Sequence, residues 1–297
     1  MSDKIKVITH SSKFHTDDIF AVATLVILLG RENVDVIRSR EMDIIKKGDY
    51  VVDVGEVYDV STNRFDHHQK GGAGVRNNGV PYAAFGLVWK TFGETLCGSK
   101  EVMEEVDRVL IQPLDAGDNG MEFLETKVDG LHQFDIGSLT YIFSPTWKEE
   151  SENLDTIFLK LVSYAVEVLK RQITVGNHNA EGKKFVLEAY ESAIDKRIIE
   201  VDERYPWEEV LNKFPEPLFV IYKKRIDNTW SIKTIREDIF SYTPRKKLPE
   251  SWSGKNKEDL EKVIGITDLV FCHNNLFMAV AKSKESVLKI AEITLNS

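Results

Sequence analysis

Residues 66–68 are Asp-His-His, three adjacent side chains that can bind metal ions and contact phosphate, in a 297-residue chain with only seven histidines. Four of these histidines fall within the first 68 residues, and the same stretch contains Asp17, Asp18 and Asp53 beside or just after apolar runs. Carboxylates and imidazoles gathered at the ends of strands are what a divalent-metal site needs. Alone, the tripeptide would also fit a solvated turn, but together with the upstream groups it predicts a metal centre.

The candidate ligand set is large enough for two metal ions. Its members are His10, His15, Asp17, Asp53, Asp66, His67, His68, Asp115 and Asp118. Two divalent cations about 3.5–4 Å apart need a set of this size, usually with one bridging carboxylate, and such a pair clamps a phosphoryl group and generates hydroxide near neutral pH. The mixture of nitrogen and oxygen donors predicts Mn²⁺, with Fe²⁺, Co²⁺, Zn²⁺ or Mg²⁺ as alternatives, although a site for Mg²⁺ only would be all oxygen.

Alternating strands and helices are expected to position these side chains. Short β-branched or apolar runs predict strands over Lys4–Thr9, Val34–Arg38 and Tyr50–Val54. Strands that alternate with helices favour a mostly parallel sheet, with ligands bound outside the carboxyl ends of the strands. His10 and Asp53 both fall at such ends, so the α/β pattern predicts that they meet there.

We expect a metal-binding domain over residues 1–205 and a smaller α+β domain over 206–297, since Pro206, Pro215 and Pro217 mark a boundary. Periodicity predicts helices over Asp17–Leu29, Tyr82–Phe92, Lys100–Leu114, Asn153–Val175, Ala180–Tyr205 and Lys284–Leu295. The fourth and fifth of these are expected to form an antiparallel pair, and Asp115–Gly120 a turn rich in carboxylates. Further strands are predicted over Leu218–Tyr222, Ser231–Ile235, Leu269–His273 and Phe277–Ala281.

Composition favours a soluble protein of the cytoplasm. The longest apolar run, Ile19–Leu29, is too short to span a bilayer, the N-terminus lacks a signal-peptide pattern, and two distant cysteines fit a reducing compartment. The net charge of −9 argues against indiscriminate binding of nucleic acid. Residues 218–255 nevertheless contain nine Lys or Arg and four Asp or Glu, which keeps a phosphate-bearing ligand open at one face.

The motifs resemble those of the DHH phosphoesterase superfamily and, more closely, its MYG-type branch, often labelled metal-dependent protein hydrolase. The matching stretches are Thr9–Asp18, Val51–Gly55, Arg64–Gln69, Leu114–Gly120, Arg245–Trp252 and Phe271–Phe277. The general pattern of the first loop in the superfamily is His-x-x-x-Asp-x-Asp. Here it is His10, His15 and Asp17, with one extra residue and a histidine for the first aspartate, which is the departure that indicates the MYG branch.

The resemblance implies a role for each motif. His10 and His15 would bind one metal, Asp17 and His67 the other, and Asp53 would bridge both. His68 would lie near the phosphate or the leaving group, and we expect Asp66 to orient a neighbouring histidine as a hydrogen-bond acceptor. The fourth motif leaves Asp115 and Asp118 as alternative ligands. Asp18 fits a carboxylate at a helix N-terminus better than a ligand.

The superfamily architecture implies a larger Rossmann-like domain and a smaller C-terminal domain that closes over the substrate. Arg245, Lys247, His273 and Asn274 are then the candidates for holding distal phosphates. Some relatives have a glycine-rich motif in the last domain, where this chain has Asn275–Val280 with larger side chains.

Three functions follow as hypotheses. The resemblance implies a metal-dependent phosphoesterase that hydrolyses phosphodiester bonds as a 3′-to-5′ exonuclease on RNA or single-stranded nucleic acid. A small substrate such as pyrophosphate, a dinucleotide or a short oligonucleotide is the first alternative. A non-catalytic binding or regulatory protein that retains the metals is the second. The sequence leaves the oligomeric state open, with a homodimer among the alternatives.

Overall fold

The computed structural model describes residues 4–125, 128–131, 134–149 and 153–297. The chain divides into two compact units, Met1–Asn177 and His178–Ser297, which we call unit 1 and unit 2. The division falls earlier in the chain than the boundary expected at residue 205. In the described part of the chain, no helix is both long enough and apolar enough to cross a membrane.

Unit 1 is built on a five-stranded sheet in the order β2-β1-β3-β5-β4. The strands are β1 Ile5–Thr9, β2 Val34–Arg38, β3 Tyr50–Val52, β4 Tyr58–Asp59 and β5 Arg64–Phe65. β1 pairs in parallel with β2 and β3, β3 pairs in parallel with β5, and only the edge strand β4 is antiparallel. The expectation of a mostly parallel sheet with flanking helices is therefore confirmed, and the carboxyl ends of β1, β3 and β5 lie side by side.

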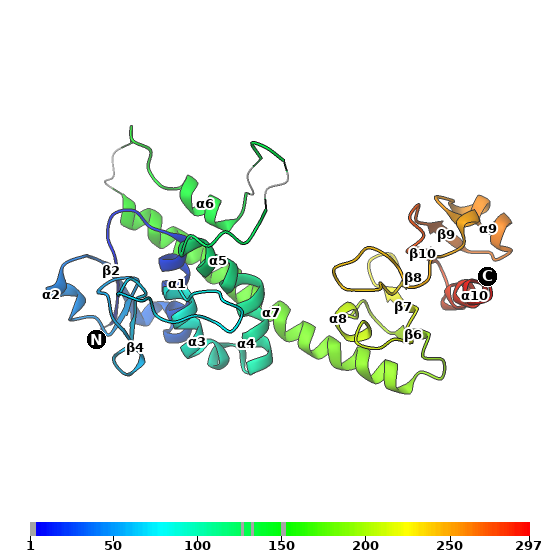
Figure 1. Cartoon of the computed structure of the whole chain (residues 1–297), viewed down its shortest axis with the longest axis horizontal. Coiled ribbons are helices and arrows are strands. Elements are labelled where there is room, and N and C mark those ends of the chain that lie inside the picture. The colour runs from blue at the N-terminus through cyan, green and yellow to red at the C-terminus, as the bar shows by residue number, and fades with distance from the viewer. Residues whose placement is uncertain (1–3, 126–127, 132–133, 150–152) are drawn as a thin grey trace. The chain divides into compact units, whose positions relative to one another are not determined.

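Helices flank this sheet (Figure 1). They are α1 Thr16–Leu29, α2 Met42–Ile45, α3 Ala84–Cys97, α4 Lys100–Val106, α5 Gln112–Asp118 and α6 Ile136–Ile142, with short 3-10 turns at Arg31–Asn33 and Val60–Thr62. α1 packs against α3, and ten consecutive residues of α1, Asp17–Val26, are buried. This helix lies in the interior because its sequence is apolar on every side, apart from the two aspartates of its first turn.

The prediction of a turn over Asp115–Gly120 is wrong for its first four residues, and only Asn119 and Gly120 form a turn. Asp115 lies inside α5, which continues from α4 through a π-helical segment, Asp107–Ile111. The wider π turn accommodates Pro113, which cannot donate the usual helical hydrogen bond. Gly120 adopts a φ of +68° just beyond the end of the helix. The consequence is that Asp115 and Asp118 are fixed on a helix, three residues apart.

The predicted antiparallel pair of helices is also wrong, because α7 runs as one helix from Leu154 to Ser192 (Figure 1). Gly176 lies between the two predicted helices and Gly182 lies inside the second, and both are sites of close packing. A Cβ at Gly176 would lie 2.8 Å from Val102, and one at Gly182 would lie 2.8 Å from Pro206. The second half of the predicted helix Ala180–Tyr205 instead contains a strand, Ile198–Val201.

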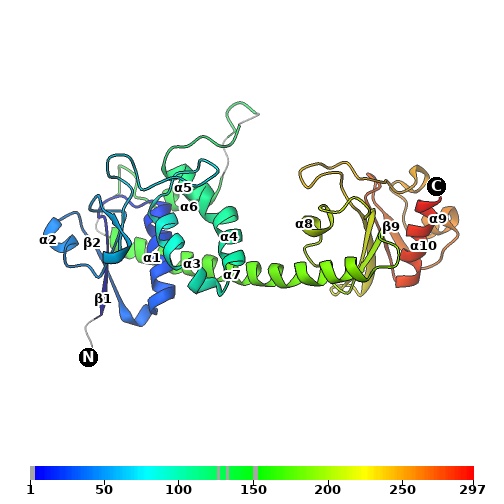
Figure 2. The ribbon, with the colours of Figure 1, turned by 60° about the horizontal axis from the view of Figure 1, so that its bottom comes forward.

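Unit 2 contains a second five-stranded sheet, in the order β6-β7-β8-β10-β9 (Figure 2). Its strands are β6 Ile198–Val201, β7 Phe219–Lys224, β8 Thr229–Thr234, β9 Leu269–Cys272 and β10 Met278–Ala281. Only β6 and β7 pair in parallel, and the other neighbouring strands of this sheet are antiparallel. The helices are α8 Glu208–Leu211, α9 Lys257–Ile264 and α10 Lys284–Leu295, with a 3-10 turn at Glu250–Trp252.

The two faces of this second sheet are covered differently. One face packs against α9 and α10, through residues that include Leu260, Val287 and Ile290. The other face packs against the end of α7 and against α8, through residues that include Val186 and Leu211. Alternation along the strands sends neighbouring side chains to opposite faces, which explains why the unit has two apolar clusters.

Candidate metal centre

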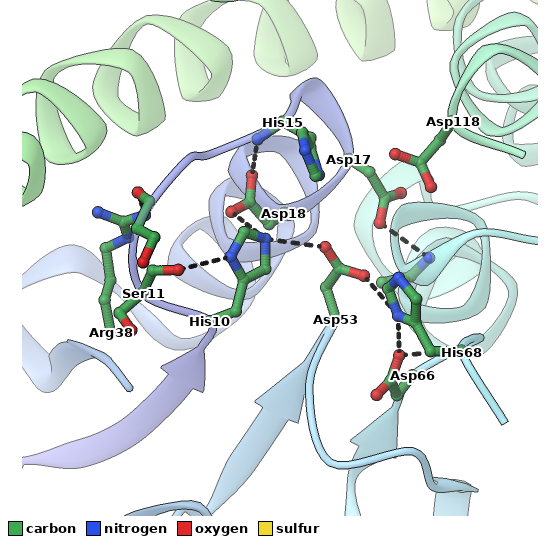
Figure 3. A network of polar contacts seen from close by, with 12 residues as sticks. His10, Ser11, His15, Asp17, Asp18, Arg38, Asp53, Asp66, His68 and Asp118 are labelled. Atoms are coloured by element: carbon green, nitrogen blue, oxygen red, sulfur yellow. Dashed lines mark hydrogen bonds and ion pairs between the residues drawn. The ribbon is translucent and has the colours of Figure 1, made fainter. Parts of the chain in front are cut away.

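Asp53 lies at the centre of the candidate site, directly after β3 (Figure 3). Its side chain is buried, and its two carboxylate oxygens face different histidines. Oδ2 lies 3.3 Å from Nε2 of His10, and Oδ1 lies 3.3 Å from Nε2 of His67. The backbone of Asp53 is left-handed, with a φ of +54°, a conformation that aspartate tolerates better than most residues. The carboxylate is therefore placed between two sets of donors, as a bridging ligand must be.

The first set of donors comprises His10, His15 and Asp53, which each offer one ligand atom within 4.8 Å of the others. His10 follows β1, and its Nδ1 lies 3.2 Å from the carbonyl oxygen of Ser11. Donation of the Nδ1 proton to that carbonyl leaves Nε2 as the free lone pair, facing the centre. His15 precedes α1, is exposed, and has its ring centroid 5.5 Å from that of His10.

The second set comprises Asp17, His67 and Asp118, which satisfy the same distance limit. Oδ2 of Asp118 lies 3.2 Å from Nε2 of His67. Asp17 is oriented by the N-terminus of α3, where its oxygens accept hydrogen bonds from the backbone N–H groups of Ala84 at 3.0 Å and Phe85 at 2.8 Å. A helix N-terminus stabilises a carboxylate and fixes its direction. Asp17 is thereby held with free lone pairs toward the second set.

Of the two alternatives that the sequence left open, the structure brings only Asp118 to the cluster. Asp115 is fully buried and turned toward Arg76, whose Nη1 lies 2.8 Å from Oδ2. Its other oxygen accepts a hydrogen bond from the backbone N–H of Gly86. Burial raises the pKa of Asp115 to about 7, against the opposing effect of Arg76. These contacts give Asp115 a structural task in joining α5 to α3.

Asp66 and His68 lie beside Asp53, and His68 satisfies the same distance limit with Asp53 and His67. Oδ1 of Asp66 accepts hydrogen bonds from the backbone N–H groups of both histidines that follow it, and Oδ2 accepts one from Glu56. Nδ1 of His68 lies 2.7 Å from Oδ1 of Asp66, whereas 56% of the His68 side chain is exposed. The geometry fits the expected orienting role of Asp66. It leaves Nε2 of His68 available to a ligand.

Asp18 has a contact that the sequence analysis missed. Its Oδ1 accepts a hydrogen bond from the backbone N–H of His15, as expected for a carboxylate in the first turn of a helix. Its Oδ2, however, lies 3.1 Å from Nε2 of His10. Asp18 is fully buried, which is unusual for a carboxylate that only caps a helix. The sequence predicted Asp18 as a carboxylate at a helix N-terminus, but nothing in the spacing predicted the second contact.

The donor atoms fit divalent cations. Both oxygens of Asp53, Nε2 of His10 and of His67, and Oδ2 of Asp18 are buried without a well-formed hydrogen bond among the described residues. Buried polar atoms are almost always paired, so atoms that converge without pairing indicate a cationic ligand. Nitrogen and oxygen donors of this kind suit Mn²⁺, Fe²⁺, Co²⁺ or Zn²⁺.

Without metal, the carboxylates hold protons on the histidines. Burial opposes the charging of His10, but Asp18 and Asp53 outweigh it and raise its pKa to about 10. Burial opposes the charging of His67 in the same way, but Asp118 and Asp53 raise its pKa to about 11. The pKa of Asp53 is lowered, because its two histidine neighbours outweigh its burial. The carboxylates therefore stabilise positive charge at both histidines.

The four residues expected to bind distal phosphates, Arg245, Lys247, His273 and Asn274, all lie in unit 2. Arg245 donates hydrogen bonds from its guanidinium to the backbone carbonyls of Asn212, Phe214 and Pro217, so it holds that loop. Nδ1 of His273 accepts a hydrogen bond from the backbone N–H of Asn275. Lys247 and Asn274 are exposed. Their contact with phosphate stays a prediction.

A family model described as "MYG1_exonuc: Uncharacterised protein family (UPF0160)" matches residues 6–295. The chain belongs to this family. It is similar to the MYG1 protein of Dictyostelium discoideum, with 28% identity over 327 residues that cover 100% of this chain and 98% of the relative. The MYG1 protein of Chlamydia pneumoniae is 29% identical, with 97% and 95% covered. The MYG1 exonuclease of Homo sapiens is 25% identical, with 97% and 85% covered.

A cavity of about 450 Å³ adjoins the metal centre of this UPF0160 family member. Asp53, Asp66 and His68 line it on one side, and Arg40 and Met42 are among the residues that line the rest. Ligand sites are usually concave, with a few convergent polar groups on a largely apolar lining. The cavity therefore gives a ligand access to the exposed ring of His68, beside the buried Asp53.

Proposed function

We propose that this protein is a metal-dependent phosphoesterase that hydrolyses phosphodiester bonds, as a 3′-to-5′ exonuclease on RNA or single-stranded nucleic acid. The observation that carries the proposal is the place of Asp53, whose two oxygens face the two donor sets. Relatives in mouse and human are named MYG1 exonuclease, which supports a nuclease. The proposal includes membership of the DHH superfamily, with the parallel sheet of unit 1 as its Rossmann-like sheet.

Two divalent ions, with Mn²⁺ preferred, would be held by His10, His15 and Asp53 on one side and by Asp53 with Asp17, His67 and Asp118 on the other. When bound, such ions activate water and neutralise charge on the phosphoryl group. The protein's own contribution is to fix the donors. α3 orients Asp17, and the carbonyl of Ser11 orients His10.

His68 would act on the substrate rather than on the metals. Asp66 holds its Nδ1, so the ring is fixed and Nε2 faces outward, where it can donate a proton to a phosphate oxygen or a leaving group. Asp66 stays in place through three backbone N–H donors, so it positions the ring without touching the substrate.

The test is an assay panel on end-labelled RNA and DNA, dinucleotides and pyrophosphate, each with Mn²⁺, Mg²⁺, Zn²⁺ or EDTA. We expect release of nucleotides from one end of single strands, supported best by Mn²⁺ and abolished by EDTA. Asp53→Ala should lower turnover by at least about a hundredfold. The control is Asp35→Ala, which changes an exposed carboxylate on β2. Full activity of Asp53→Ala would contradict the two-metal centre.

A small substrate is the second candidate, and the charge distribution favours it. Residues 1–177 contain 19 Lys or Arg and 28 Asp or Glu, so unit 1 carries the whole net charge of −9. The cavity of about 450 Å³ is also of a size for one small ligand. A rate that depends little on substrate length and on salt would favour it, because contacts with many phosphates produce a steep salt dependence. Metal binding without turnover would instead favour a regulatory protein.

We also propose that the protein is located in the cytoplasm. Cys97 and Cys272 are both buried and free, as expected in a reducing environment.

A further inference from the structure

A cleft of about 1000 Å³ opens in unit 2, on the face of the sheet that α7 and α8 cover only in part. Its floor is formed by Tyr222, Ser231, Lys233 and Met278. The strand register places these side chains on one face, because Ser231 pairs with Tyr222 and Lys233 pairs with Met278. The walls come from the end of α7, from residues 203–206 and from the turn after β7. None of the lining residues belongs to the metal centre.

Part of the positive charge in the cleft forms no ion pair among the described residues. Lys224 and Arg225 at its rim pair with Asp227 and Glu203 respectively. In contrast, Arg204, Lys223 and Lys233 also line the cleft, and within the described part of the chain none of the three has an ion pair. Three unpaired cations in one concave surface form a site for an anion.

Lys233 is the most informative of these cations, because it lies half-buried in the floor. Burial lowers its pKa, and the nearby charges of Arg204 and Arg236 lower it further, against the opposing charge of Glu208. A lysine that is crowded by two guanidinium groups gains from a bound anion more than a solvated lysine does. Beside it, Ser231 is fully buried, and its hydroxyl contacts Tyr222. A phosphate oxygen in the cleft would pair with Lys233.

An aromatic surface adjoins the cations. Phe185 on α7 is 40% exposed, and its ring centroid lies 5.2 Å from that of Tyr205. Both rings line the cleft. Proteins that bind single strands combine a positive groove, which follows the backbone, with exposed rings on which bases stack. The cleft has both parts within one unit whose overall charge is zero, since residues 178–297 contain 20 Lys or Arg and 20 Asp or Glu.

We propose that this cleft binds a segment of single-stranded nucleic acid, with a phosphate on Lys233 and Arg204 and a base stacked on Phe185. The inference rests on the proposed function, which it deepens by assigning a second contact to a polymeric substrate. It replaces Arg245, which is occupied by backbone carbonyls, as the main basic contact of unit 2.

The test is binding of labelled single-stranded oligonucleotides to the full chain, measured by fluorescence anisotropy. The parent protein carries Asp53→Ala, so that bound strands are not degraded. In this background we expect Lys233→Met to weaken binding of a long oligonucleotide about tenfold and to reduce the salt slope by about one. Phe185→Leu should weaken it by a similar factor, with the salt slope unchanged. Lys233→Arg should retain the affinity.

Two matched controls remove the same chemical groups elsewhere in unit 2. Lys289→Met changes an exposed lysine on α10, and Phe240→Leu changes a phenylalanine that is 88% exposed, and neither residue lines the cleft. Both controls should bind like the parent. Circular dichroism melting curves show whether each variant is folded. If Lys233→Met and Phe185→Leu are folded and bind with the parental affinity and salt slope, the proposal is wrong. If both variants weaken the binding of a mononucleotide by the same factor, the cleft is a site for a mononucleotide and the proposal of a polymer site is overturned.

A small chromogenic phosphodiester separates this inference from the proposed function, because its hydrolysis needs the metal centre and not the cleft. When Asp53 is retained, the cleft variants should hydrolyse this substrate at the same rate as the protein without substitutions. Absence of all hydrolysis, together with strand binding that depends on Lys233, would reject the enzyme and keep the cleft. Normal hydrolysis with strand binding that is insensitive to the variants would reject the cleft and keep the enzyme.

Discussion

At the scale of single residues, the centre depends on side chains whose directions are set by backbone groups. Asp17, Asp66 and Asp18 each accept backbone N–H donors, and these contacts fix carboxylates that would otherwise repel one another. The residue types at strand ends were enough to predict that His10 and Asp53 meet. They could not show which of Asp115 and Asp118 faces the centre, since that choice depends on the rotation of α5 and on the pairing of Asp115 with Arg76.

His67 and His68 are adjacent, yet they should fail in different ways. His67→Gln should lose bound metal, because Nε2 of His67 faces Asp53 and Asp118. His68→Gln should keep its metal content but lower kcat by about 10²–10⁴, the range for a lost proton donor. Metal analysis and steady-state kinetics on both variants check this. Loss of metal from His68→Gln would show that His68 is a ligand.

Metal affinity should rise with pH. The pKa of His10 is raised from 6.5 to about 10 in the metal-free protein, so protons occupy the imidazole at neutral pH and compete with metal. The stability that the protonated imidazole contributes is fully present below pH 6.5 and is lost as the pH rises through about 10. We expect the dissociation constant for Mn²⁺ to fall between pH 7 and 9, with proton release measurable by calorimetry in two buffers. A flat profile would contradict this prediction.

At the scale of elements, β1, β2, α1 and α10 could be predicted from local patterns, whereas the continuity of α7 could not. Strands β1 and β2 consist largely of β-branched residues, so the local sequence determines them. α7 passes through Gly176 and Gly182, which weaken a helix in isolation. Packing against Val102 and Pro206 explains both glycines, and these contacts are distant in the sequence. Tertiary contacts of this kind are invisible to periodicity.

Gly86 should be essential for the contact between α3 and α5. A Cβ there would lie 1.8 Å from Oδ2 of Asp115 and 2.7 Å from Nη2 of Arg76. Gly86→Ala should therefore break this buried ion pair and lower the free energy of unfolding by about 3–5 kcal/mol. Gly117→Ala in α5 is the control, because its Cβ would have no atom within 4 Å. The control should be neutral or stabilising by up to about 1 kcal/mol. Equal denaturation midpoints for the two variants would contradict the prediction.

At the scale of the whole molecule, the family match over residues 6–295 includes both units, and the candidate metal donors named above all lie in unit 1. Two units were expected from the sequence, but the division between them at Asn177 was not, because α7 continues through it. Unit 1 carries the net charge of −9, and bound cations would offset part of this charge. Unit 2 is neutral and contains the basic cleft.

Chelation should therefore affect the two units unequally. Ligands that bind only the folded state stabilise it, by about 2.7 kcal/mol at a concentration a hundred times the dissociation constant. We expect calorimetry with Mn²⁺ and then with EDTA to shift only the unfolding of unit 1. Asp53→Ala should remove that shift. A shift of the same size in the Asp53→Ala variant would place the stabilising metal elsewhere.

The central claim is that Asp53 bridges two metal ions, and anomalous diffraction at the manganese edge from crystals grown with Mn²⁺ tests it most directly. The structure predicts two peaks about 3.5–4 Å apart. One peak should lie against His10 and His15 and the other against Asp17, His67 and Asp118, with one oxygen of Asp53 bound to each. A single peak, or two peaks without Asp53 between them, would contradict the account.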